Sequence, residues 1–114
     1  MLEQMIVNNQ DRINLQGDVQ IPGDKSISHR SLMILAICLG KARISNLLES
    51  EDVLATKNIL EELGVKITKE GKDYIVSGNG RFGFRQPSKP LDCGNSGTTI
   101  RLISGLLATQ PITS

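Results

Sequence analysis

The sequence predicts an α+β fold in which helices and strands are mixed along a chain of 114 residues. Three observations favour this class: a segment with alternating apolar residues, two helix-like segments that end near glycines, and two short strands joined by a turn. In chain order they give strand, helix, strand, helix, strand, strand, which is a compact βαβαββ unit. At this length the chain has room for one small domain with a modest core.

The first half of the unit is predicted from periodicity. Apolar residues alternate over 13–21, which is typical of a half-buried strand. A helix is predicted from Ser26 or Ser28 to Leu39, and its residues are apolar on nearly every face, so we expect it to be buried on most sides. A short strand is expected over 42–46.

The second half of the unit is predicted from a cap and a turn. Ser50 is a good N-cap for a helix that ends at Leu63. Segments 65–68 and 74–76 are expected to be strands of a hairpin. The following segment, 78–90, is rich in Gly, Pro and basic residues and is interpreted as a connection.

The organisation of the chain suggests a part of something longer. Residues 1–21 are the predicted opening strand, 22–90 the first unit with its connection, and 91–114 the start of a second unit. In this last segment we expect a strand end at 91–93 and a helix over 96–108. Because a second unit of this size leaves its helix uncovered, we interpret the chain as a piece of a larger protein.

Composition excludes several classes of function. The formal net charge is +1, from 13 basic and 12 acidic residues, and the only aromatic residues are two Phe and one Tyr, so a nucleic-acid partner is not expected. Cys38 and Cys93 are too few and too far apart for a disulfide framework or a zinc site. No signal peptide is visible, and the longest apolar run, 32–39, is too short to span a membrane. We expect a soluble, cytoplasmic protein without a membrane partner.

Two segments are suited to binding phosphate. Segment 22–30 reads PGDKSISHR, and segment 92–101 reads DCGNSGTTIR. Each places small residues and hydroxyls at the head of an apolar run, with an arginine about one turn in. A helix start carries unpaired N–H groups and a partial positive charge, glycine allows close approach, and Lys or Arg supplies countercharge. The sequence therefore predicts two anion sites, or one substrate with two anionic ends.

These motifs resemble those of a known family. Segment 22–30 resembles the first signature of the 5-enolpyruvylshikimate-3-phosphate synthases, or 3-phosphoshikimate 1-carboxyvinyltransferases, and 94–101 is similar to their second signature. The helix start at 51–53 also fits. The resemblance covers nearly the whole chain but only about the opening quarter of the family's usual length.

The resemblance implies a reaction and an architecture. Family members transfer the enolpyruvyl group of phosphoenolpyruvate to the 5-hydroxyl of shikimate 3-phosphate and release phosphate, in the route to aromatic amino acids. Their two domains are built from βαβαββ units around buried helices, in an inside-out barrel, and they need no metal or organic cofactor. The expected partners are therefore the two substrates and the remainder of the enzyme. Glyphosate is expected to occupy the phosphoenolpyruvate site.

The resemblance also implies site residues, with Lys25 as the catalytic residue that touches both substrates. For shikimate 3-phosphate it implies Lys25, Ser26 and Arg30, and for phosphoenolpyruvate Lys25, Asn95, Gly97, Thr98 and Arg101. The carboxylates that the family uses as acid and base lie in its later part, so they are not assigned here. Ser96 and Leu102 depart from the family's common Ala and Pro, so the response to inhibitors is left open.

Structural roles compete with some of these assignments. Arg101 could be an ion-pair partner of Asp92, and Asn95 could cap a helix. His29 is interpreted as a structural hydrogen-bond donor, and the acidic run 49–52 as a helix start.

Two other functions remain as alternatives. One is the sister enzyme that adds enolpyruvyl to UDP-N-acetylglucosamine, which usually shows Lys-Asn where this chain has Lys25-Ser26. The other is a fragment or split half that binds a phosphorylated ligand without turnover. Whichever function holds, we expect that the 114-residue chain alone does not catalyse enolpyruvyl transfer.

Overall fold

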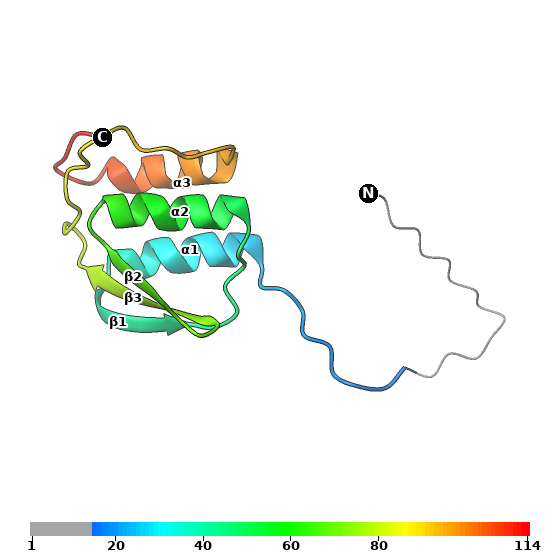
Figure 1. The fold of residues 1–114 in the computed structure, drawn as a ribbon. Coiled ribbons are helices and arrows are strands. Elements are labelled where there is room, and N and C mark those ends of the chain that lie inside the picture. Colours follow the sequence, from blue (N-terminus) through cyan, green and yellow to red (C-terminus); the bar gives the residue numbers. More distant parts are fainter. Residues whose placement is uncertain (1–14) are drawn as a thin grey trace.

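A computed structural model describes residues 15–114, which form a three-stranded sheet with helices stacked against one face (Figure 1). The sheet is antiparallel in the order β1-β3-β2. The first helix packs on β1 and β3, the second on β2, and the third on the other two helices. The elements are α1 (Lys25–Ala36), β1 (Leu39–Ile44), α2 (Glu51–Glu62), β2 (Lys66–Glu70), β3 (Asp73–Asn79) and α3 (Gly97–Leu107).

All three helices run in the same direction, so they begin at the same end of the molecule. In Figure 1 this is the right-hand end of the helical layer, with α2 between α1 and α3. The right-hand end therefore gathers three sets of unpaired backbone N–H groups and three positive dipole ends. Such an end of the molecule favours the binding of an anion.

The predictions for α2, the hairpin and α3 are confirmed. The Ser50 side chain accepts a hydrogen bond from a backbone N–H in the first turn of α2. The hairpin strands β2 and β3 pair with a register that joins Glu70 to Asp73 across a two-residue turn. At the third helix, Ser96 is the N-cap of α3. These elements have strong local signals at their ends.

The predicted strand over 13–21 is wrong for the residues that the structure describes, and residues 13 and 14 lie outside them. Residues 15–21 form no strand, and their apolar side chains Leu15, Val19 and Ile21 are 74% to 89% exposed. No strand of the described sheet lies beside them, and an unpaired strand cannot satisfy its backbone groups. The expected strand end at 91–93 is absent for the same reason. The opening strand of the predicted βαβαββ unit is therefore missing from the described part.

The first helix is shorter than predicted. It ends at Ala36, and the chain enters β1 at Leu39. The helix is also not buried on most faces, because Ile27 and Ile34 are 66% and 57% exposed. A continuous apolar run cannot by itself separate the end of a helix from the start of a strand, and here the pairing of β1 with β3 decides.

The hydrophobic core lies between the helices and the inner face of the sheet. Alternate residues of β3 point into it, and one stripe of α2 covers it. Burying each Leu, Ile, Val or Phe contributes about 1.5–3 kcal/mol. The buried apolar residues are Leu32, Met33, Ala36, Leu47, Val53, Ile59, Leu60, Leu63, Val65, Ile67, Tyr74, Val76, Phe84 and Ile103.

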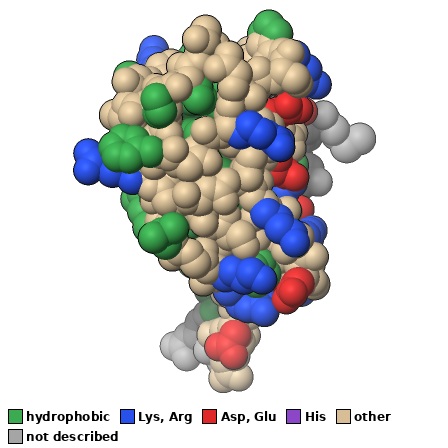
Figure 2. All heavy atoms as spheres, turned by 90° about the vertical axis from the view of Figure 1, so that its left-hand side faces the viewer, with side chains coloured by type: hydrophobic (Ala, Val, Ile, Leu, Met, Phe, Trp, Pro, Cys, Tyr) green, Lys and Arg blue, Asp and Glu red, His purple; other side chains and the backbone are tan. Residues whose placement is uncertain are grey.

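Figure 2 shows the opposite end of the molecule, where the helices finish. On this face Lys and Arg side chains lie beside Asp and Glu side chains along one edge, and hydrophobic side chains lie mainly toward the other edge. Along the first of these edges, positive charge therefore has negative charge beside it. Among residues 15–114, no helix combines the length and the apolar character needed to cross a membrane.

The glycine at position 78 in β3 allows the end of α1 to lie directly on the sheet. A Cβ at Gly78 would overlap the backbone oxygens of Leu35 and Cys38. Because backbone atoms cannot move aside as a flexible side chain can, we expect Gly78→Ala to lower the free energy of unfolding by about 3 kcal/mol. Urea unfolding of the 114-residue chain measures this change.

Gly105 supplies a control for that substitution. It lies inside α3, and a Cβ there would meet no atom within 4 Å. Gly105→Ala should raise the free energy of unfolding by about 0.5–1 kcal/mol, because alanine loses less conformational freedom in a helix. Equal effects of the two substitutions would show that α1 does not rest on Gly78 as described.

Candidate anion-binding site at three helix starts

Each helix start at this end of the molecule carries its own cap. The side chains of Asp24, Ser50 and Ser96 accept hydrogen bonds from a backbone N–H three residues further on, at 2.8, 3.3 and 3.1 Å. The cap of α1 is a carboxylate, which can be charged, whereas the caps of α2 and α3 are neutral hydroxyls. The start of α1 is therefore already partly compensated by negative charge.

Part of the first motif is used to build the fold. A Cβ at Gly23 would overlap the backbone oxygen of Asn46, so only glycine permits this close approach. The buried Ser28 hydroxyl donates to the Asp24 carbonyl oxygen at 2.6 Å and accepts from the Leu48 N–H at 3.1 Å. These contacts join the start of α1 to the segment after β1.

The remaining polar residues of the first motif are exposed. Lys25, Ser26 and Arg30 of α1 are all exposed. The Lys25 amine forms an ion pair with the Asp52 carboxylate, which lies in the first turn of α2, and the Lys25 side chain stays 48% exposed. The Arg30 guanidinium donates to the Ser26 carbonyl oxygen at 3.1 Å, so it folds back toward the helix start. The three residues that the resemblance assigns to shikimate 3-phosphate are thus accessible.

The second motif begins with a tight turn. Gly94 has a positive φ of 58°, which glycine adopts without steric cost, and its N–H donates to the Asp92 carboxylate at 2.7 Å. The Asp92 carboxylate therefore already accepts a hydrogen bond within this turn. Within the described residues, Arg101 forms no ion pair with Asp92 or another carboxylate, and its side chain is exposed on α3.

The start of α3 presents backbone donors to solvent. Ser96, not Asn95, supplies the cap. Among the described residues, the N–H groups of Asn95, Gly97 and Thr98 have no hydrogen-bond acceptor. A Cβ at Gly97 would meet nothing within 4 Å, so the space in front of this helix start is open. This arrangement can accept an anion without displacing a protein group.

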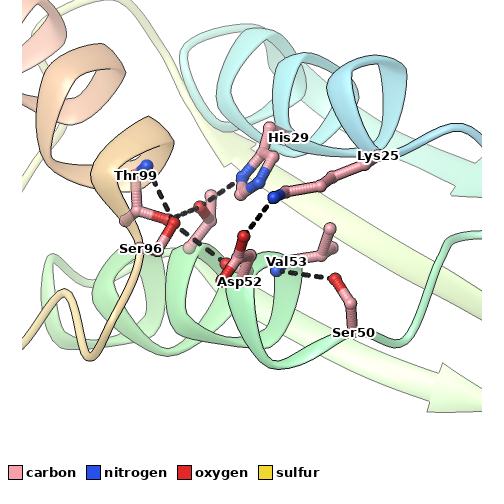
Figure 3. Close-up of polar contacts among 8 residues, drawn as sticks. Lys25, His29, Ser50, Asp52, Val53, Ser96 and Thr99 are labelled. Atoms are coloured by element: carbon pink, nitrogen blue, oxygen red, sulfur yellow. Dashed lines mark hydrogen bonds and ion pairs between the residues drawn. The ribbon is translucent and has the colours of Figure 1, made fainter.

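A buried chain of hydrogen bonds links the two motifs (Figure 3). The ring nitrogen Nδ1 of His29 lies 2.7 Å from the Thr56 hydroxyl, which lies 2.9 Å from the Thr99 hydroxyl. The Thr99 hydroxyl in turn donates to the Asp52 carbonyl oxygen at 3.2 Å. The chain thus joins α1, α2 and α3 just behind the exposed residues.

The sequence interpretation missed most of this arrangement. His29 is a structural hydrogen-bonding residue, as expected. The run 49–52 does contain a helix start, but nothing in the sequence around it indicates that Asp52 pairs with Lys25. Thr56 and Thr99 carried no local signal, because their partners lie 27 and 43 positions away in the sequence.

Burial changes the protonation of two side chains near the motifs. It lowers the pKa of His29 below its ordinary value of 6.5; Asp52 opposes this shift, while Lys25 and Arg30 add to it. Burial also raises the pKa of the Cys93 thiol, assisted by Asp92, so the thiol is poorly suited to act as a nucleophile. Among residues 15–114, no three His, Cys, Asp or Glu side chains gather in a way that could hold a metal ion.

Comparison with known proteins identifies the family. A family model described as EPSP synthase (3-phosphoshikimate 1-carboxyvinyltransferase) matches residues 9–114. The chain belongs to the EPSP synthase family. A 3-phosphoshikimate 1-carboxyvinyltransferase from Oenococcus oeni is 54% identical over 96 residues, which are 84% of this chain and 22% of the relative. One from Alkaliphilus metalliredigens is 46% identical over 106 residues, or 93% of this chain and 25% of the relative.

A solved structure of EPSP synthase from Acinetobacter baumannii has the same arrangement of elements. It matches with a TM-score of 0.79 and 40% sequence identity, over 85% of this chain and 23% of that one. The expected α+β class and the family are thereby confirmed. The chain spans about a quarter or less of the length of these EPSP synthase relatives.

The open start of α3 should be the preferred anion site of the chain. We expect sulfate to shift the amide NMR signals of Asn95, Gly97 and Thr98, since these N–H groups are unpaired. Smaller shifts are expected at Lys25 and Ser26, where the Asp24 carboxylate opposes an incoming anion. A titration of the labelled 114-residue chain measures both sets of signals.

Sodium chloride at matched ionic strength is the control for this titration. Screening by salt alone should shift charged regions throughout the chain, whereas a site should respond to sulfate and reach saturation. Shifts confined to other parts of the chain, with both helix starts silent, would contradict the presence of preformed anion sites.

Proposed function

We propose that this chain supplies phosphate-binding contacts for transfer of the enolpyruvyl group from phosphoenolpyruvate to the 5-hydroxyl of shikimate 3-phosphate. One observation carries the proposal. In each motif the fold uses some residues internally, whereas every residue that the family resemblance assigns to a substrate stays at least partly accessible near the shared helix-start end.

Lys25, Ser26 and Arg30 form the proposed contact with shikimate 3-phosphate. The two exposed cations and the exposed hydroxyl provide charge-assisted and neutral hydrogen bonds to a phosphate dianion. Lys25 also faces the second substrate in this proposal. The Asp52 carboxylate holds the Lys25 amine toward α2, and a substrate phosphate would compete with it for this amine.

Asn95, Gly97, Thr98 and Arg101 form the proposed contact with phosphoenolpyruvate. At the start of α3, N–H groups without an acceptor among the described residues lie next to Gly97, where a Cβ would meet no atom within 4 Å. Such a helix start binds the phosphate of a small substrate well, and Arg101 adds countercharge one turn later. Glyphosate, an anionic inhibitor with a phosphonate, would occupy the same place.

The reaction explains why these groups are needed. The 5-hydroxyl oxygen adds to C2 of phosphoenolpyruvate while C3 takes up a proton. The C2–O bond to phosphate then breaks, phosphate leaves, and loss of a C3 proton restores the enol. Fixed cations and N–H groups stabilise the charge on the departing phosphate in a water-poor cleft. Lys25 acts as an electrostatic clamp between the two anions, and the reaction is expected to take place in the cytoplasm.

A chimera tests this function directly. The matched 96 residues of this chain replace their counterpart in the Oenococcus oeni relative, to which they are 54% identical. We expect the chimera to consume both substrates and release phosphate, whereas the 114-residue chain alone does not. A folded chimera that binds the substrates without turnover would instead support the alternative of a binding part without activity.

Removal of the Lys25 amine should nearly abolish turnover. Lys25→Ala in the chimera is expected to lower kcat by about 100-fold or more, because it removes the one cation proposed to contact both substrates. Phosphate release under saturating conditions measures kcat. A variant that keeps more than about a tenth of the rate would overturn the catalytic assignment.

Ser26→Ala is the matched comparison on the same helix turn. It removes a neutral hydrogen bond worth about 1 kcal/mol, so KM for shikimate 3-phosphate should rise about fivefold with little change in kcat. If KM for phosphoenolpyruvate rose instead, the two substrate sites would be assigned the wrong way round.

A methyl group at position 97 should report on the phosphoenolpyruvate site. Because the protein leaves room for a Cβ there, Gly97→Ala should not destabilise the fold. We expect it to raise KM for phosphoenolpyruvate about tenfold, since the methyl occupies space proposed for the ligand. Gly105→Ala, which adds the same group to α3 away from its start, should leave that KM unchanged. Equal KM values in both variants would place the substrate elsewhere.

A further inference from the structure

His29 is a buried titratable residue to which the proposed reaction gives no task. Its side chain is fully buried, which is uncommon for a residue that can carry a charge. Nδ1 contacts Thr56, whereas Nε2 is buried without a hydrogen-bond partner among the described residues. A buried polar atom without a partner is unfavourable, so the fold keeps this ring for some reason other than packing alone.

The proton positions in the chain of hydrogen bonds follow from counting donors. A carbonyl oxygen can only accept, so the single hydroxyl proton of Thr99 goes to the Asp52 carbonyl. The Thr56 hydroxyl must then donate its own proton to Thr99. Thr56 can therefore only accept from the ring, and Nδ1 of His29 carries the proton. The neutral ring leaves Nε2 as a bare acceptor.

Each member of this chain lies about one helical turn from a proposed substrate contact or its partner. His29 follows Lys25 by four residues on α1, and Thr56 follows Asp52 by four on α2, so each pair shares one helix face. Thr99 lies in the first turn of α3, directly after the unpaired donors. Figure 3 shows the Lys25 and His29 side chains both pointing toward α2.

We propose that His29 is a positioning residue, whose Nδ1–H orders the Thr56 and Thr99 hydroxyls and so holds the starts of α1, α2 and α3 in the register that both substrate sites need. The kinetic part of this proposal rests on the proposed function. The direction of the hydrogen bonds from His29 through Thr56 to Thr99 does not depend on that function.

Protonation of the ring would disturb this arrangement. The charged groups that act on the ring are Lys25 and Arg30 of α1, which repel a positive charge, and Asp52 of α2, which attracts it. A second ring proton would also give Nε2 an N–H with no acceptor among the described residues. The fold therefore holds His29 in its neutral form.

The tautomer can be observed directly because His29 is the only histidine in the chain. A nitrogen-15 spectrum of the imidazole ring in the 114-residue chain should show the proton on Nδ1 at neutral pH. Thr56→Val should shift it to Nε2, the form that free histidine prefers, whereas Thr68→Val on the exposed side of β2 should not. A ring protonated at Nε2 in the unchanged chain would overturn the proposal.

Two amide substitutions separate positioning from packing. The amide nitrogen of Asn can take the place of Nδ1, whereas that of Gln reaches the place of Nε2. In the chimera, His29→Gln should raise KM for both substrates about tenfold or more, because both helix starts shift. His29→Asn should stay within about threefold of the unchanged protein. A Gln variant with a lower melting temperature but unchanged KM values would reduce His29 to a packing role.

The pH dependence of stability provides a readout that needs no turnover. Because the folded state lowers the pKa of His29, the unfolded state binds more protons near the ordinary value of 6.5. The contribution of His29 to stability is thus complete above pH 6.5 and is lost as the pH falls toward the lower, folded pKa. In urea unfolding, the free energy of unfolding of His29→Asn should fall less between pH 7.5 and 5.5 than that of the unchanged chain. The decrease that remains in the variant is the part due to carboxylates.

These outcomes distinguish the two proposals. If the unchanged chimera has no activity while the ring carries its proton on Nδ1 and the pH effect depends on His29, the proposed function fails and the hydrogen-bond order stands. If the chimera is active and the Gln and Asn variants have equal KM values, the function stands and the positioning role fails.

Discussion

The structure depends on bringing three helix starts to one end of a small domain. Each start carries a partial positive charge, so the three would repel one another if nothing compensated them. The fold places three carboxylates, Asp24 at the start of α1 and Glu51 and Asp52 at that of α2, where the dipoles favour negative charge. The neutral hydroxyls of Thr56 and Thr99 then tie the helices together without adding charge.

The start of α1 carries a carboxylate cap and the start of α3 does not, and this difference separates the roles of the two motifs. At α1 the cap is a carboxylate and the surface groups are cations, so a ligand is bound chiefly by side chains. At α3 the cap is a hydroxyl, and among the described residues the N–H groups of Asn95, Gly97 and Thr98 have no acceptor, so a ligand can reach the main chain. A lysine between the two starts, already paired with Asp52, can respond to an anion on either side.

The sequence predicted the elements whose ends have local signals. Ser50 and Ser96 cap helices because a hydroxyl can satisfy a free N–H within its own turn, which needs no distant partner. The strand over 13–21 was predicted from alternation alone, which shows an apolar side but cannot supply a neighbouring strand. Similarly, the change from helix to strand near Leu39 is decided by pairing with Asn79, 40 positions later.

For the candidate site, the family resemblance named accessible residues but did not show what supports them. The pairs Lys25–Asp52, His29–Thr56 and Thr56–Thr99 join different helices, and nothing in the spacing of these residues along the chain indicates that they meet. Such pairs follow from the three helices being parallel and adjacent. A single sequence can therefore suggest which residues face a ligand, but it does not suggest which residues hold them in place.

The helical period explains how one short motif carries both roles. Residues 26 and 30 lie on the exposed side of α1, whereas 28 and 29 turn inward and form contacts with other elements. Lys25 shares the face of His29, but its longer side chain ends in the partly exposed ion pair with Asp52. In α3, Thr98 and Arg101 similarly lie away from the buried side of the helix. Thr99 and Ile103 form that buried side. Substitutions one residue apart should therefore act on different quantities, binding on the exposed side and helix placement on the buried side. Since helix placement also sets where the binding groups lie, a buried change can alter affinity for both ligands, while an exposed change alters affinity for one.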